Sequence, residues 1–137
     1  VTSLALGNVI QVTGTATFLS DSLLNILENS SKLMIISSFF IFVSITTNFI
    51  SNNACAVLFT PIAVDMSLKL GIDPKIFAIA LIFAVNTSFT TPLAYQTNLL
   101  VMGPGHYKFI DYIKFGLPLT IVCWLAFMIT FPIIFKI

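Results

Sequence analysis

Charged side chains gather in three short clusters of the sequence and leave four long runs without any charge. Only 8% of the residues are charged and 58% are hydrophobic, whereas about 25% of the residues in soluble domains are charged. Ionised side chains avoid the hydrocarbon core of a bilayer, so charge-free runs indicate segments that lie within a membrane. We therefore predict an all-α, multi-pass integral membrane protein. The four runs cover residues 1–20, 33–64, 76–107 and 115–135.

The same composition argues against several classes of function. Six lysines, five acidic residues and no arginine give a net charge of +1, which leaves no basic surface to follow a nucleic-acid backbone. The two cysteines, Cys55 and Cys123, stand in apolar surroundings and are interpreted as small hydrophobic residues rather than as a disulfide. No nucleophile, base and orienting group fall at useful spacing, so neither enzyme activity nor an organic cofactor is expected.

The second charge-free run is too long for one membrane span and is polar at its centre. A straight helix over residues 33–64 would be about 48 Å long, whereas the hydrocarbon core is about 30 Å thick. Its polar side chains cluster between Ser44 and Asn53. Polar groups and nonhelical backbone persist at that depth only where protein buries them or water reaches them. We predict a re-entrant helical hairpin over residues 33–68 that turns at Ser51-Asn52-Asn53.

The third charge-free run has a similar length and a second polar centre. Asp73-Pro74 stands before it, and proline is favoured at the first position of a helix. Thr91-Pro92 interrupts it, because proline removes a backbone hydrogen bond and clashes with the preceding turn. A second half-helix would resume near Asn98 and end at Gly103-Pro104-Gly105, which is a strong turn signal. We predict a discontinuous transmembrane helix over residues 74–103.

The remaining segments complete this prediction. Residues 115–136 would form a plain last transmembrane helix, and residues 1–20, which mix small and polar side chains with apolar ones, an inner transmembrane helix. Residues 21–32 alternate apolar and charged side chains, which is typical of an interfacial linker. At roughly 20 residues per span the chain holds about four or five segments, fewer than a typical carrier needs. We therefore expect residues 1–137 to be a partial transporter domain.

The two polar centres, each at a predicted helix break, indicate a binding site. Where half-helices meet near the bilayer midplane, helix N-terminal amides attract an anion and unwound carbonyls take a cation. The alternative is that Ser, Thr and Asn bridge helices inside a membrane bundle, where each bond contributes about 0.6 kcal/mol. The polar residues are contiguous rather than spaced at helical intervals, which favours the binding site.

Three motifs follow one another in a recognisable order: the tip Ser51-Asn52-Asn53, then Thr91-Pro92-Leu93-Ala94-Tyr95-Gln96-Thr97-Asn98, then Gly103-Pro104-Gly105-His106-Tyr107. This order resembles the C-terminal half of the divalent anion:sodium symporter family, which carries sulfate and di- or tricarboxylates. The resemblance implies the second inverted repeat of a secondary transporter that works by alternating access. Asn53 stands where that family has threonine, and Tyr95-Gln96-Thr97-Asn98 replaces the Thr-Pro-rich stretch of the dicarboxylate carriers. Both departures look like the sulfate-type branch. Sulfate is therefore the favoured substrate, and di- or tricarboxylates remain possible.

The resemblance also implies site residues and partners. Sodium would be the coupling ion, and the site would be completed by an N-terminal half of the same polypeptide. A homodimer in the cytoplasmic membrane is expected from the same likeness. The substrate-binding residues would be Ser51, Asn52, Asn53, Gln96, Thr97 and Asn98. Sodium would lie near Asn52, Thr90, Thr91, Pro92, Ala94 and Tyr95.

Two other functions stay open for this sequence. A sodium/proton antiporter or an oxyanion permease would share the hairpin and the broken helix, but such antiporters need a carboxylate within the membrane, and the four charge-free runs contain none. Asp65 stands next to a hairpin arm, at its water end. A non-transporting membrane subunit would require both polar centres to be dry and bonded to each other. His106 has no second metal ligand near it in the sequence and is interpreted as a loop residue.

Overall fold

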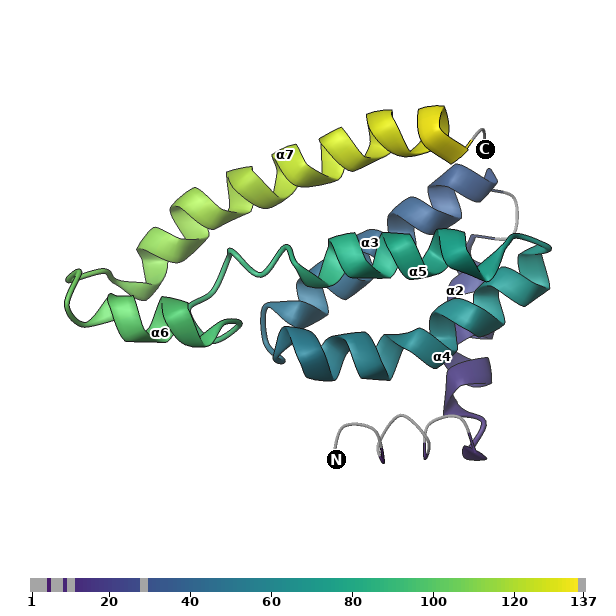
Figure 1. Cartoon of the computed structure of the whole chain (residues 1–137), viewed down its shortest axis with the longest axis horizontal. Helices are drawn as coiled ribbons and strands as arrows, with labels where there is room; N and C mark the ends of the chain where they lie inside the picture. The colour runs from purple at the N-terminus through teal and green to yellow at the C-terminus, as the bar shows by residue number, and fades with distance from the viewer. Residues whose placement is uncertain (1–4, 6–8, 10–11, 28–29, 136–137) are drawn as a thin grey trace.

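The computed structural model describes residues 5, 9, 12–27 and 30–135, and this part of the chain contains helices and no β-strand. Helices α4 and α7 are long and apolar enough to cross a membrane, and α3 and α5 are shorter apolar helices. The all-α expectation is confirmed for the described residues. Their helices are α2 (Thr15–Ile26), α3 (Lys32–Thr47), α4 (Asn52–Leu70), α5 (Pro74–Val85), α6 (Gln96–Met102) and α7 (Phe109–Phe135) (Figure 1).

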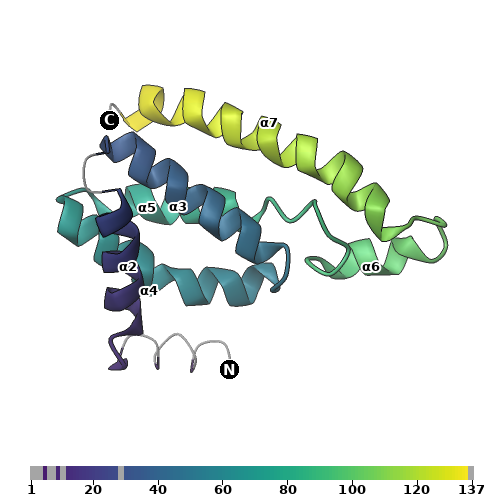
Figure 2. The ribbon, with the colours of Figure 1, turned by 180° about the vertical axis from the view of Figure 1, so that it is seen from behind.

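Helices α3 and α4 are joined by a tight turn at which the chain reverses its direction, as both views show (Figures 1 and 2). Ser31 caps α3 by accepting a hydrogen bond from the Met34 amide at 3.3 Å. Ser51 caps α4 by accepting one from the Ala54 amide at 3.4 Å. A serine oxygen is a preferred cap because it satisfies one of the free amides of the first helical turn. The turn therefore occupies residues 48–51, earlier than the predicted turn at Ser51-Asn52-Asn53, because the Ser51 cap lets α4 begin at Asn52.

Helices α5 and α6 are separated by a nonhelical stretch, residues 86–95 (Figure 1). α5 begins at Pro74, and the Asp73 carboxylate caps it by accepting from the Lys75 amide at 2.9 Å. The helix ends at Val85, next to the end expected at Ala84 and before the break at Thr91-Pro92; there the Thr87 hydroxyl donates back to the Ala84 carbonyl at 2.6 Å and competes with the helical ladder. α6 then begins at Gln96, just before the predicted restart at Asn98.

The first and last helices have different bounds from those expected. α2 continues through residue 20 to Ile26, so part of the predicted linker 21–32 is helical; residues 1–4, 6–8 and 10–11 of the predicted inner helix lie outside the described residues. α7 begins at Phe109, before the predicted 115. There the Asp111 carboxylate accepts a hydrogen bond from the Lys108 amide at 2.8 Å, which stabilises a helix start within the charge cluster.

The hydrophobic core lies where α3, α4 and α5 meet. Phe39 of α3 packs edge-on against Phe59 of α4 and Phe77 of α5, with ring centroids 6.2 and 5.6 Å away. α7 lies along the outside of this group and contacts it through Phe127, whose ring stacks on Phe40 at 4.6 Å (Figure 1). Most of the apolar surface of α7 is exposed. An apolar surface of this extent suits lipid or further protein rather than water.

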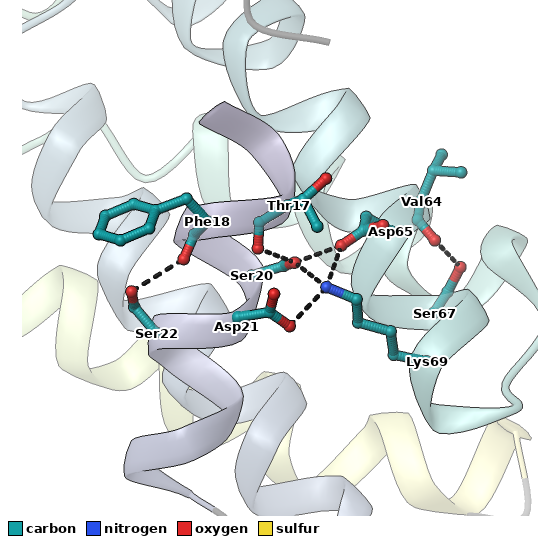
Figure 3. A network of polar contacts seen from close by, with 9 residues as sticks. All are labelled: Thr17, Phe18, Ser20, Asp21, Ser22, Val64, Asp65, Ser67 and Lys69. Carbon is teal, nitrogen blue, oxygen red and sulfur yellow. Dashed lines mark hydrogen bonds and ion pairs between the residues drawn. The ribbon is translucent and has the colours of Figure 1, made fainter. Parts of the chain in front are cut away.

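A cluster of charged and polar side chains ties α2 to α4 (Figure 3). Lys69 Nζ lies 2.6 Å from Asp21 Oδ1 and 2.7 Å from Asp65 Oδ2. The fully buried Ser20 donates its hydroxyl to Asp65 and accepts a hydrogen bond from Lys69 Nζ at 2.9 Å. One lysine therefore bridges two carboxylates from two helices, and Asp65 is engaged in this ion-pair cluster.

Candidate functional site

The C-terminal end of α3 is bonded to the nonhelical stretch through two buried side chains, Ser44, whose hydroxyl lies 2.6 Å from the Thr87 hydroxyl, and Asn48. Asn48 Nδ2 donates to the Ser44 carbonyl at 2.7 Å and to the Thr87 carbonyl at 3.4 Å, and Asn48 Oδ1 accepts from the Thr90 amide at 2.8 Å. The Thr91 hydroxyl donates to the Asn48 main-chain carbonyl. Asn48 is 5% exposed. The hairpin turn and the nonhelical stretch therefore form one hydrogen-bonded unit.

A second set of bonds connects the start of α4 to the same stretch. The Thr47 hydroxyl lies 2.9 Å from Asn52 Oδ1 and 3.0 Å from the carbonyl oxygen of Val85, the last residue of α5. Asn52 Nδ2 donates to the Ser88 hydroxyl at 3.2 Å. Asn52 is the first residue of α4, so its side chain lies at the positive end of a 19-residue helix. The predicted tip residue Asn52 is thus fixed against Ser88.

The start of α6 approaches the stretch through Asn98. Asn98 Nδ2 lies within hydrogen-bond distance of the Ser88 and Thr91 carbonyls, at 3.4 and 3.5 Å. The hydroxyl of Tyr112, in α7, donates to the Asn98 carbonyl at 2.8 Å. Asn98 therefore links α6, the nonhelical stretch and α7.

These elements enclose a small open pocket of about 180 Å³. The pocket has no acidic or basic side chain, and its polar lining consists of amide, hydroxyl and phenol groups. Such a site can offer N–H and O–H donors to an anion, helped by the N-terminal end of α4, and oxygen atoms to a cation. The lining residues are Asn52, Asn86, Ser88, Phe89, Tyr95 and Asn98.

The structure brings some of the predicted site residues together and leaves others apart. Three of them, Asn52, Tyr95 and Asn98, line the pocket. Ser51 and Asn53 are exposed on either side of Asn52. Gln96 and Thr97 are exposed on α6 and are not among the lining residues. Of the residues expected near sodium, Thr90 is half-buried, and Thr91, Pro92 and Ala94 are buried within the nonhelical stretch.

Several residues of this region were not predicted as site residues. Asn86 and Ser88 line the pocket, and Thr47, Asn48 and Thr87 hold its walls together. All five lie in the two polar centres of the sequence, so contiguity of polar residues was the signal that could have found them. That signal does not distinguish a residue that faces the pocket from one that supports it.

A larger groove of about 360 Å³ runs between α3 and α7, on residues that include Phe40, Asn48 and Trp124. Trp124 Nε1 donates to the Ser37 hydroxyl at 3.0 Å, so this tryptophan packs against α3 as a protein contact. The groove is mostly apolar and lies against the same nonhelical stretch, through Thr90 and Thr91.

The described residues contain no group of three or more His, Cys, Asp or Glu side chains that could hold a metal ion. The oxygen atoms gathered here belong to side-chain amides, hydroxyls and unwound backbone. Carriers use this kind of donor set for a monovalent cation such as sodium, which suits the expected coupling ion.

Comparison with known proteins matches the chain to transporters. A sequence profile described as citrate transporter matches residues 2–137. An uncharacterized transporter of Synechocystis is 36% identical over 88% of the chain. A sodium/sulfate cotransporter of Chlamydomonas reinhardtii is 28% identical over 71% of the chain, and a sodium/citrate cotransporter of Rattus norvegicus is 36% identical over 58%. The chain spans only 20%, 11% and 14% of the lengths of these three relatives.

Proposed function

Because this chain belongs to the citrate transporter family, we propose that it forms the hairpin and broken-helix part of a sodium-coupled symporter for small divalent anions. Sulfate is the favoured substrate, and di- or tricarboxylates are the second class. Two relatives are named as a sodium/sulfate and a sodium/citrate cotransporter, which supports both the coupling ion and the substrate class. The activity belongs to a larger carrier, of which this chain contributes one part.

One observation carries this proposal: Asn52, Tyr95 and Asn98, which come from the start of α4, the nonhelical stretch and α6, line the same uncharged pocket. In the proposed site the anion is bound by neutral donors, chiefly the Asn52 amide and the amides at the start of α4. Ser51, Asn53, Gln96 and Thr97 complete the substrate-binding set when the rest of the carrier is present.

Sodium is placed beside the anion, against the nonhelical stretch. The residues proposed to surround sodium are Asn52, Thr90, Thr91, Pro92, Ala94 and Tyr95. Carbonyls of this segment lie outside any helical ladder, and such oxygens are suited to a partly dehydrated cation. Bound sodium also offsets one charge of the anion, which makes joint binding more favourable than binding of either ion alone.

In a membrane, α3 and α4 would be the two arms of a re-entrant hairpin and α5 with α6 a discontinuous transmembrane helix. The 16 residues of α3 span about 24 Å, which is short of the roughly 30 Å of a hydrocarbon core. A helix that stops there and turns back fits a re-entrant arm. We assign this arrangement to the second inverted repeat of an alternating-access carrier, with a homodimer in the cytoplasmic membrane as the expected assembly.

Uptake into vesicles tests the proposal on the full-length carrier that contains this sequence. Labelled sulfate and labelled citrate are offered with an inward sodium gradient or with a potassium gradient. We expect uptake of one anion to need sodium, and Asn52→Ala to abolish it. Asn25→Ala, at an exposed position of α2 away from the pocket, should transport like the wild type. Anion uptake that is the same with the sodium and the potassium gradient, or a fully active Asn52→Ala carrier, would contradict the proposal.

A further inference from the structure

The backbone of the nonhelical stretch 86–95 needs hydrogen-bond partners, and two buried or half-buried asparagines, Asn48 and Asn98, supply four of them. Backbone amides and carbonyls outside a helix need other partners at membrane depth, because water is scarce there and an unpaired group costs several kcal/mol. The Asn48 side chain bonds the Thr87 carbonyl and the Thr90 amide, and the Asn48 main-chain carbonyl accepts a hydrogen bond from the Thr91 hydroxyl. Its remaining bond, to the Ser44 carbonyl, anchors its amide to α3.

Asn48 does this from outside the pocket. It is 5% exposed and is not among the residues that line the pocket, whereas the segment that it bonds, residues 87–91, contains the lining residues Ser88 and Phe89 and two of the residues proposed near sodium, Thr90 and Thr91. Donor and acceptor are both required, because Nδ2 faces carbonyl oxygens and Oδ1 faces an amide N–H. Among uncharged side chains of this length, asparagine has both groups on one planar amide.

From these contacts we infer that Asn48 is a positioning residue for the coupling ion: it holds the unwound backbone of residues 87–91 in the shape that binds sodium. The inference rests on the proposed function and deepens it, because it names a residue that acts on sodium through the backbone rather than by contact. Loss of Asn48 should weaken sodium activation much more than it lowers the maximal rate, since the stretch must then be ordered by the ion itself.

The test measures anion uptake by the full-length carrier in vesicles across a range of sodium concentrations. Asn48→Ala removes every side-chain bond of this residue, and Asn48→Asp keeps the acceptor for the Thr90 amide but turns an oxygen toward the Thr87 and Ser44 carbonyls. Thr46→Val is the matched control, because the Thr46 hydroxyl bonds only within its own helix, to the Phe42 carbonyl at 2.9 Å. Uptake is normalised to the amount of carrier in the vesicles.

We expect the half-saturating sodium concentration to rise about tenfold in Asn48→Ala, as for the loss of one or two buried hydrogen bonds, and to rise in Asn48→Asp as well. The maximal rate at saturating sodium should change by less, and Thr46→Val should match the wild type. A half-saturating sodium concentration that stays unchanged in both Asn48 variants would overturn the inference while leaving the proposed function intact.

Two further outcomes are also decisive. If both Asn48 variants fail to reach the membrane while Thr46→Val does, Asn48 serves folding and the inference is overturned. If wild-type uptake is independent of sodium, the proposed function fails and the inference falls with it. The wild-type sodium dependence, measured first, therefore separates the failure of one claim from the failure of the other.

Discussion

Gly116 of α7 lies directly against the backbone of Phe89, in the nonhelical stretch between α5 and α6. A Cβ atom at Gly116 would overlap the Phe89 carbonyl and would lie 2.8 Å from the Thr90 Cα. The last helix therefore touches the walls of the candidate site through main chain, at a position that only glycine can occupy without displacement. Tyr112 and Thr120, one turn before and after Gly116, add contacts to Asn98 and Thr90.

Gly116→Ala should displace α7 from the nonhelical stretch. Overpacking of this kind costs about 1–3 kcal/mol. The added Cβ would meet the backbone of the nonhelical stretch rather than a side chain, so the contact has little room to relax. We expect a lower unfolding temperature of the purified full-length carrier and reduced sodium-driven uptake. Ile129→Ala, at an exposed position of the same helix, is the control. Equal stability of the two variants would contradict the close packing at Gly116.

Tyr112→Phe should weaken anion binding without removing any residue of the pocket. The lost hydroxyl donates to the Asn98 carbonyl at 2.8 Å, and one such bond contributes about 0.5–1.5 kcal/mol. The KM for the transported anion should therefore rise by up to about tenfold. Tyr107→Phe, at the exposed neighbouring ring whose centroid is 6.2 Å away, is the control. A KM that is the same in both variants would rule out a role for Tyr112 in positioning Asn98.

Lys69→Met should loosen the contact between α2 and α4. The substitution removes both ion pairs and leaves the Asp21 and Asp65 carboxylates without their shared cation (Figure 3). Partly exposed pairs contribute about 0.2–1 kcal/mol each, so a loss on the order of 1–2 kcal/mol is expected, and it should shrink in high salt. Lys75→Met, at an exposed lysine after Asp73, is the control, and thermal unfolding at low and high salt is the measurement.

Local sequence signals predicted much of the helix order, because caps and breaks depend on a few neighbouring residues. Asp73-Pro74 marks a helix start as expected and the polar stretch before Gln96 is nonhelical, whereas the turn expected at Ser51-Asn52-Asn53 lies earlier, because Ser51 caps α4 and Asn52 and Asn53 are helical. The start of α7 was predicted too late, at residue 115, because the charge-free run begins there. The helix begins at Phe109, inside a charge cluster, where the Asp111 carboxylate stabilises its first turn.

The candidate site was predictable only in part, because its geometry depends on contacts between distant segments. The tip residue Asn52 and the later residues Tyr95 and Asn98 do line one pocket. Asn48 lies in the first polar centre but nothing in the sequence singles it out, since its role arises from bonds to residues about 40 positions away. Gln96 and Thr97, which are next to Asn98 in sequence, point elsewhere on α6, which adjacency alone does not predict.

The most direct test of a sodium-dependent anion site at this pocket is the labelling rate of a single cysteine at Asn86, an exposed lining residue. All native cysteines of the full-length carrier, Cys55 and Cys123 among them, are first replaced by alanine, and Asn25→Cys on α2 is the control. A water-soluble thiol reagent should modify the Asn86→Cys carrier, and sodium together with sulfate or citrate should slow the reaction, while potassium with the same anion should not. Equal rates in all of these conditions, with the control unchanged, would contradict a sodium-coupled anion site here.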